Sequence, residues 1–201
     1  MHQRDTIINK FEKAGLATVF VVMLLRVWLG PEANFVLLVT TTLLSIYYLW
    51  FGFFIFNKLA PIKLLDKTVV RSLSSFRVFL SIFMGIIASY ALIAILTGFF
   101  FYPLMPYIIG SAFMLMVVFT TYLITYQLKK KPKLPVFRRF YYRAALFILF
   151  LGALFLTPRE ARLELLFRDY PEFIEAYIQY REHPEDDEAL QRLREERSRF
   201  R

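Results

Sequence analysis

Uncharged apolar runs occupy most of the chain. Three of them, Asn34 to Phe56, Val78 to Tyr102 and Pro106 to Leu128, contain no Asp, Glu, Lys, Arg or His. Each has the ~20 residues that a helix needs to cross a hydrocarbon layer ~30 Å thick. These runs therefore predict three transmembrane helices.

Two shorter apolar runs flank these spans, and each contains an arginine. Ala14 to Leu29 is interrupted by Arg26, and Phe140 to Leu156 has Arg143 near its start. As a helix each run is ~25 Å long, so it crosses only if its arginine reaches an interface or the bilayer thins locally. We expect both runs to span, with a re-entrant or surface-lying helix as the alternative.

The pattern predicts an all-α fold, a polytopic integral membrane helical bundle of about five transmembrane helices. The residues after the first run lack a small-x-small cleavage site, so we expect a retained helix and a tight hairpin at Gly30-Pro31. The expected parts are a cytoplasmic N-terminus at 1–13, a transmembrane domain at 14–156 with spans at about 14–29, 34–56, 78–102, 106–128 and 140–156, and a charged helical tail at 157–201.

The tail has a repeating pattern that differs from the rest of the chain. Proline recurs every thirteen residues, at Pro158, Pro171 and Pro184, and proline is favoured at the first position of a helix. Each segment also has a basic-acidic pair at the same offset: Arg168-Asp169, Arg181-Glu182 and Arg194-Glu195. We expect three short amphipathic helices whose apolar stripes pack on each other, on the membrane surface or on a partner.

The composition agrees with a membrane location. Apolar residues make up 58% of the chain and charged residues 20%, against ~45 to 50% and ~25% in ordinary soluble proteins. A soluble chain of this size could not bury so much apolar surface. The chain also has no cysteine, which excludes disulfides, thiolate metal sites and a cysteine nucleophile.

Positive charge is sorted along the chain, and this predicts the orientation. Lysine and arginine concentrate in the segments after the second and fourth spans, whereas the tail has more acidic than basic residues. The positive-inside rule then places the N-terminus in the cytoplasm and the tail outside. We expect a multi-pass protein of the cell membrane, with the asymmetry typical of a bacterial inner membrane.

Arg26 is the one formal charge well inside an apolar run, and such residues are often functional. It lies one turn from the predicted outer boundary. Its side chain can therefore reach headgroups or pair with Glu32 in the hairpin, or it can bind a substrate or a partner helix. Arg26 and Glu32 are the candidate intramembrane functional or pairing residues.

Small and hydroxylated residues form stripes on two spans, and their spacing favours close helix packing. The alternative is a polar pathway across the membrane. The candidate packing residues are Thr41, Ser45 and Gly52 on the second span, and Ser81, Gly85 and Ser89 on the third.

The basic loops have the number of positive charges associated with anionic headgroups. We therefore expect the partners to include a bilayer with anionic lipids, and no nucleic acid, because the basic residues are placed as topology requires. The candidate lipid contacts are Lys63, Lys67, Arg71, Lys129, Lys130, Lys131, Lys133, Arg138 and Arg139.

The sequence offers little catalytic chemistry. His2 and His183 are the only histidines, and no known hydrolase, metalloprotease or nucleotide-binding motif is present. We predict no catalytic, cofactor or metal residue. The leading hypothesis is a non-enzymatic subunit or scaffold that binds a protein partner, or forms a homo-oligomer, through its helices and tail. The alternatives are a small transporter or channel and, third, a lipid-processing enzyme that uses Asp66 and loop arginines.

Overall fold

The structure is a computed structural model, and helix is the only regular secondary structure among the residues that it describes. Those residues are 7–57, 59, 61, 74–101, 104–130 and 135–199. The all-α fold predicted from the apolar pattern is confirmed.

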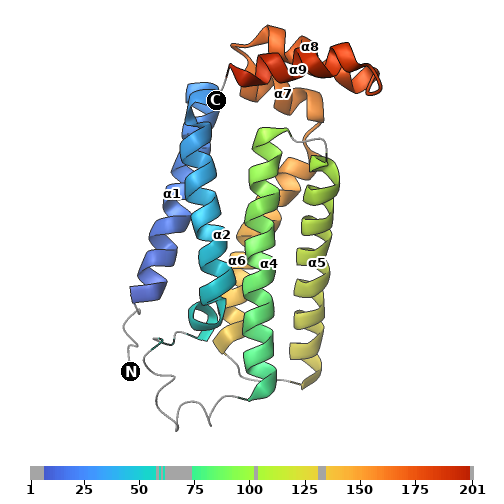
Figure 1. The fold of residues 1–201 in the computed structure, drawn as a ribbon. Helices are drawn as coiled ribbons and strands as arrows, with labels where there is room; N and C mark the ends of the chain where they lie inside the picture. The colour runs from blue at the N-terminus through green and yellow to red at the C-terminus, as the bar shows by residue number, and fades with distance from the viewer. Residues whose placement is uncertain are drawn as a thin grey trace.

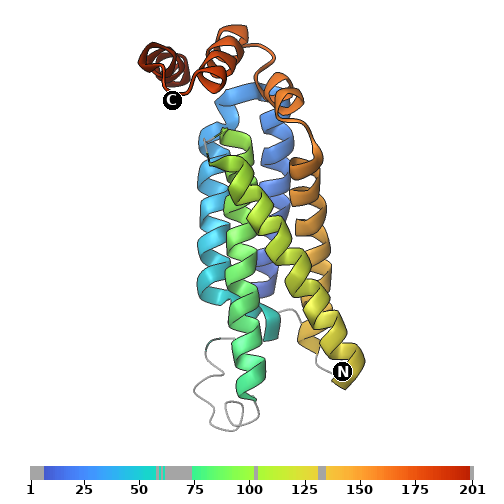
Figure 2. The same ribbon diagram turned by 90° about the vertical axis from the view of Figure 1, so that its right-hand side faces the viewer.

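Long helices run side by side in a bundle, shown from two directions in Figures 1 and 2. Their bounds are α1 (Ile7–Leu29), α2 (Asn34–Asn57), α4 (Ser75–Phe100), α5 (Met105–Lys130) and α6 (Pro135–Leu156). Length and composition give four helical segments that can cross a membrane, and the first of these, Ile7–Asn57, contains both α1 and α2. The expectation of about five membrane helices therefore fits the bundle.

A short 3-10 helix, η1 (Gly30–Ala33), reverses the chain between α1 and α2. Gly30 has a φ of +67°, which a residue with a side chain rarely adopts. Pro31 follows in the first turn of η1, where its missing N–H costs no hydrogen bond. This turn makes α1 and α2 antiparallel neighbours, as the Gly30-Pro31 pair predicts.

The central helix of the bundle is α4. In its most apolar window 61% of the residues are buried, against 22% for α5 and 28% for α6. It packs against α2, α5 and α6. The outward faces of the surrounding helices are therefore available for contact with lipid or with another protein.

The tail forms a layer across one end of the bundle (Figures 1 and 2). It consists of α7 (Arg159–Phe167), α8 (Pro171–Glu182) and α9 (Asp187–Ser198). We call this end of the bundle the tail end, and the opposite end, where α1 begins, the N-terminal end. The apolar stripes of the tail pack on each other and on the bundle, since Leu163, Leu166, Phe173 and Leu193 belong to the same buried cluster as the bundle core.

Proline marks the start of only one tail helix. Pro171 is the first residue of α8, as predicted, but Pro158 precedes α7 and Pro184 lies in the turn before α9. In α9 the side chain of Asp186 accepts a hydrogen bond from the Glu188 amide at 2.9 Å. A carboxylate cap of this kind satisfies a free amide at the start of the helix.

Two long helices begin at least five residues before their apolar runs. The first starts at Ile7 rather than Ala14, and α6 starts at Pro135 rather than Phe140. As a result Glu12, which the sequence places in a cytoplasmic N-terminus, lies inside α1 and is buried.

Candidate functional site

Arg26, in the last turn of α1, is fully buried at the tail end of the bundle. Its Nε donates to Asn34 Oδ1 of α2 at 2.6 Å, and its Nη1 donates to the Leu166 carbonyl of α7 at 2.9 Å. Its guanidinium also lies over the Phe167 ring, 4.9 Å from the centroid. One side chain thus joins the first helix, the hairpin and the tail.

The expectation that Arg26 reaches headgroups or pairs with Glu32 is wrong. The arginine has no exposed surface, and Glu32 in η1 is exposed. The tail covers the end of α1, so it removes the path to headgroups and supplies a carbonyl in place of a carboxylate. Within the described residues the positive charge is held by these two hydrogen bonds and the aromatic face, and Arg26 Nη2 is buried without a hydrogen-bond partner, a costly arrangement in a dry interior.

Phe101 is the aromatic centre of the contact between bundle and tail. It follows α4 with a left-handed φ of 52°, and it is fully buried. Its ring meets those of Phe167 and Tyr177 edge to face, each at 5.7 Å between centroids. Arg197 Nη2 donates to its carbonyl at 3.2 Å. Both α7 and α8 are therefore packed on the end of α4.

A second buried charge lies near the N-terminal end. The Glu12 carboxylate of α1 is 1% exposed and accepts two hydrogen bonds from Arg143 of α6, one of them from Nη2 at 2.5 Å. The Tyr48 hydroxyl of α2 donates to the same carboxylate at 2.6 Å. This ionic cluster (Glu12, Tyr48 and Arg143) ties three helices together, and its paired charges offset part of the desolvation cost.

Further polar contacts join the helices around that cluster. Asn57, the last residue of α2, accepts from Arg77 Nε at 2.6 Å and donates to Ser81 Oγ at 2.9 Å, both on α4. Arg139 of α6 donates to the Phe56 carbonyl at 2.7 Å. The N-terminal end is therefore fixed by side-chain hydrogen bonds as well as by packing.

The sequence analysis did not single out Glu12, but the sequence contained a signal for it. Glu12, Val19 and Arg26 are seven residues apart, which places them on one face of a helix. All three are buried in α1. Extending the helix back from Ala14 on that face would have placed Glu12 inside the bundle.

The small residues of α2 and α4 lie at the contact between these two helices. A Cβ added to Gly52 would lie 2.6 Å from Gly85 Cα, so the two backbones touch. Ser45 and Ser89 share a hydrogen bond of 2.8 Å between their hydroxyls. Of the other candidates, Ser81 bonds to Asn57, and Thr41 is fully buried with no hydrogen-bond partner for its hydroxyl among the described residues.

The candidate lipid contacts are only partly covered by the structure. Lys63, Lys67, Arg71, Lys131 and Lys133 lie outside the described residues, as does the side chain of Lys130. Lys129 and Arg138 are exposed, at the end of α5 and the start of α6. Arg139 is half-buried and bonds to the Phe56 carbonyl, so part of its donor capacity is used inside the bundle.

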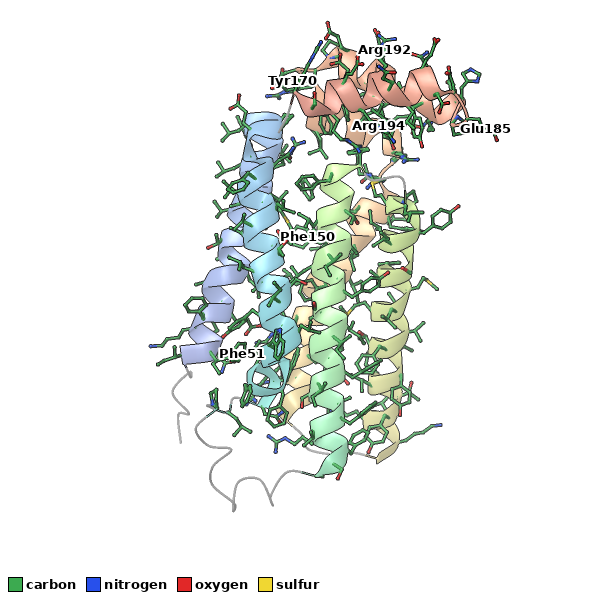
Figure 3. The ribbon with its side chains drawn as sticks, in the orientation of Figure 1. Phe51, Phe150, Tyr170, Glu185, Arg192 and Arg194 are labelled. Atoms are coloured by element: carbon green, nitrogen blue, oxygen red, sulfur yellow. The ribbon has the colours of Figure 1, made fainter. Side chains whose placement is uncertain are left out.

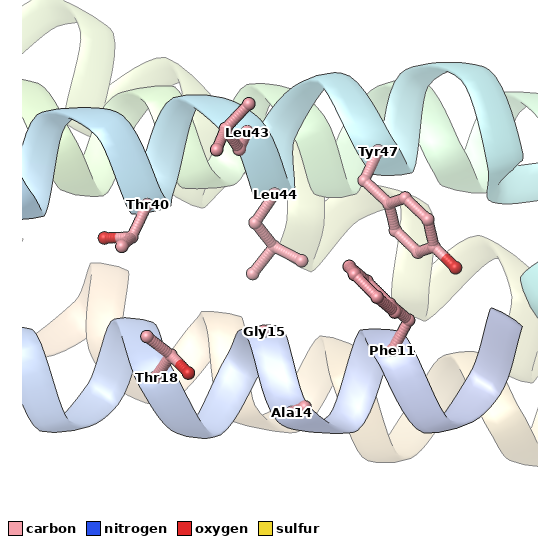
Figure 4. A pocket seen from close by; sticks show the side chains of 8 residues that line it. All are labelled: Phe11, Ala14, Gly15, Thr18, Thr40, Leu43, Leu44 and Tyr47. Carbon is pink, nitrogen blue, oxygen red and sulfur yellow. The ribbon is translucent and has the colours of Figure 1, made fainter. Parts of the chain in front are cut away.

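An apolar groove of about 460 Å³ runs between α1 and α2 (Figure 4). Phe11 and Tyr47 close one end, and Leu43 and Leu44 form one wall. Its polar members include Thr40, whose hydroxyl donates to the Val36 carbonyl of its own helix at 2.7 Å. The groove could therefore hold an apolar group, but the described residues of its lining include no side chain suited to catalysis.

The bundle thus contains two polar centres, one at each end, built from arginine, carboxylate, amide and phenol groups. Among the described residues no three His, Cys, Asp or Glu side chains come together as a metal site would require. No family model, no curated protein and no solved structure matches the chain.

Proposed function

We propose that this chain is a non-enzymatic integral membrane subunit or scaffold of a larger membrane complex. The observation that carries the proposal is the hydrogen bond from Arg26 to the Leu166 carbonyl, which fixes α7 on the bundle. Isolated helices of fewer than ~12 to 15 residues are marginal in water, and the tail helices fall in or below that range. Held on the bundle, they present one fixed surface to a partner.

The hydrogen bonds of the buried charged side chains also support a scaffold role. Arg26 and the ionic cluster form hydrogen bonds that join different helices. Such contacts specify how helices pair and in which register. A subunit needs this rigidity because its partner must meet the same surface each time.

The outer faces of the bundle offer area for a partner in the membrane. Large aromatic side chains stand out from it, among them Trp50 on α2 and Tyr142 on α6, which are 73% and 74% exposed. Aromatic residues are enriched where proteins associate and at membrane interfaces. The proposed partner is a second membrane protein or another copy of this chain.

The proposed location is the cell membrane, with the N-terminal end in the cytoplasm and the tail outside, as in a bacterial inner membrane. The start of α1, the end of α2, the end of α5 and the start of α6 lie at the same end of the bundle (Figure 1). The segments rich in lysine and arginine adjoin that end in the sequence. Positive charge marks the cytoplasmic side in membranes of this kind.

Photo-crosslinking in native membranes tests the proposal. A benzoylphenylalanine replaces Trp50 on the bundle or Glu185 on the tail, and irradiation is followed by purification in mild detergent. We expect a discrete adduct from each position, with the same protein co-purifying at a fixed ratio. Arg26→Leu should remove the tail adduct, whereas the exposed control Arg168→Leu should keep it. If irradiation leaves only the 23.9 kDa chain, with no heavier adduct from either position, the proposal is contradicted.

A further inference from the structure

A pocket of about 350 Å³ lies between the tail helices and the end of α4. All three tail helices contribute to its wall. Its polar lining contains no acidic side chain and consists of Arg159, Tyr177, Tyr180, Arg181, Arg194 and Arg197. Four guanidinium groups therefore surround one small space, although the tail as a whole is net acidic.

The hydroxyl of Tyr177 is the clearest sign that this pocket is built for a ligand. Tyr177 is only 4% exposed and lines the pocket, and within the described residues its hydroxyl forms no full hydrogen bond, although it lies close to the Arg159 side chain. Arg159 stacks its guanidinium over the Tyr177 ring at 5.1 Å, and its own buried Nε is also without a partner. Buried polar atoms are rarely left unpaired in proteins.

The surrounding charges act on this hydroxyl. Burial raises the pKa of Tyr177, and the positive charges of Arg159, Arg181 and Arg197 oppose that rise. The net effect of these neighbouring arginines on the hydroxyl is therefore that of positive charge. A negatively charged group placed there would be attracted by all of these cations.

Ion pairs within the described residues leave two of the four pocket arginines, Arg159 and Arg194, without a carboxylate. Glu160 accepts from Arg181, and Glu196 lies 2.8 Å from Arg199, which is outside the pocket. Like charges gathered without a counter-ion repel each other, and a bound anion would relieve that repulsion.

We propose that this pocket binds a phosphate group through its arginines and the Tyr177 hydroxyl. Guanidinium forks match the oxygens of phosphate, and a phenol donates to the remaining oxygen. Trp28 and Tyr107 are both 77% exposed at the tail end, and such aromatics sit at headgroup level. The group can therefore come from a phospholipid headgroup or from free phosphate, which share this chemistry.

The experiment uses the full chain in maltoside detergent, which contains no phosphate. Inorganic phosphate is titrated by calorimetry in one arm. In the other arm short-chain phosphatidylglycerol is added and its retention is measured by native mass spectrometry, with diacylglycerol as the phosphate-free control. Arg194→Gln and Tyr177→Phe test the pocket. Arg192→Gln is the matched control, because Figure 3 shows Arg192 on the side of the tail away from the bundle and Arg194 on the side facing it.

We expect saturable binding of at least one phosphate probe and no retention of diacylglycerol. Arg194→Gln should weaken binding by about tenfold or more, the amount expected for a lost charged hydrogen bond. Tyr177→Phe should weaken it by a few fold, and Arg192→Gln should leave it unchanged. Binding of inorganic phosphate identifies the free anion as sufficient, and binding of the lipid alone identifies the headgroup. Failure of both probes, or wild-type affinity in both pocket variants, would overturn the proposal.

Discussion

Arg26 Nη1 and the Leu166 carbonyl form a 2.9 Å hydrogen bond across 140 residues of sequence. It joins the first membrane helix to the first helix of the tail, in a position from which water and lipid are excluded. A carbonyl at the end of a helix has a partial negative charge, so it suits a buried cation that has no carboxylate. This contact holds the tail on the bundle together with the ring contacts of Phe101 and the hydrogen bond from Arg197.

Replacing Arg26 should loosen the tail from the bundle. Arg26→Leu leaves the Leu166 carbonyl and the Asn34 side chain without their donor, so we expect a loss of about 2 to 4 kcal/mol of stability. A glutamate-specific protease, whose sites neither substitution removes, should then cut the tail faster, and the thermal midpoint in detergent should fall. Arg168→Leu, at an arginine whose side chain is 60% exposed, should change neither measurement appreciably.

Removing both members of the buried ion pair should cost less than the two single losses added together. Glu12→Ala leaves Arg143 uncompensated inside the bundle, and we expect a loss of about 3 to 5 kcal/mol. The double variant with Arg143→Ala should lose less than the sum of the two single variants. Denaturant unfolding of the four proteins gives the coupling energy. Additive losses would show that the two residues do not interact, and Lys10→Ala on the exposed side of α1 is the control.

The contact between α2 and α4 should not accept a methyl group. In Gly52→Ala the new Cβ meets the Gly85 backbone, which cannot rotate away, so we expect a loss of about 1 to 3 kcal/mol. In Gly110→Ala the nearest atom belongs to the Phe155 side chain at 3.3 Å. That variant should be far less affected, since alanine also favours the helix. Thermal unfolding of both variants checks the difference.

The tail should weaken in acid through Glu160. A hydrogen bond from its own backbone amide and then one from Arg181 lower the pKa of Glu160 below 4.5. A carboxylate with a lowered pKa stabilises the fold above the ordinary pKa and loses that effect as the pH falls through the lowered value. Glu160→Gln should therefore be less stable than wild type at about pH 7, and the difference should be smaller at about pH 3. An unchanged difference at both values would rule out this carboxylate as the cause.

The orientation can be tested directly because the chain has no cysteine. Lys129→Cys at the end of α5 and Glu185→Cys before α9 place single thiols at exposed positions at opposite ends of the bundle. In intact cells a membrane-impermeant maleimide should label the Glu185→Cys protein only, and broken cells should allow both to be labelled. The reverse pattern would place the tail in the cytoplasm.

Local sequence pattern was enough to predict the helices and their approximate positions. Apolar runs of fixed length and the Gly30-Pro31 turn are local features, and the bundle follows them closely. Sequence pattern also indicated that Thr41, Ser45 and Gly52 share a face of the second span. It could not say which helix packs against that face. Helical periodicity shows only which residues lie on the same side of one helix.

The partners of the buried charged side chains become visible only in the folded bundle. Glu12 and Arg143 are 131 residues apart, and nothing local in either segment predicts that they meet. Arg26 was expected to have headgroups or Glu32 as its partner, but the folded tail covers it and supplies the Leu166 carbonyl. The pocket of arginines likewise exists only because three short helices fold onto the end of α4. Burial and pairing depend on contacts distant in sequence, so they emerge only when the chain is packed.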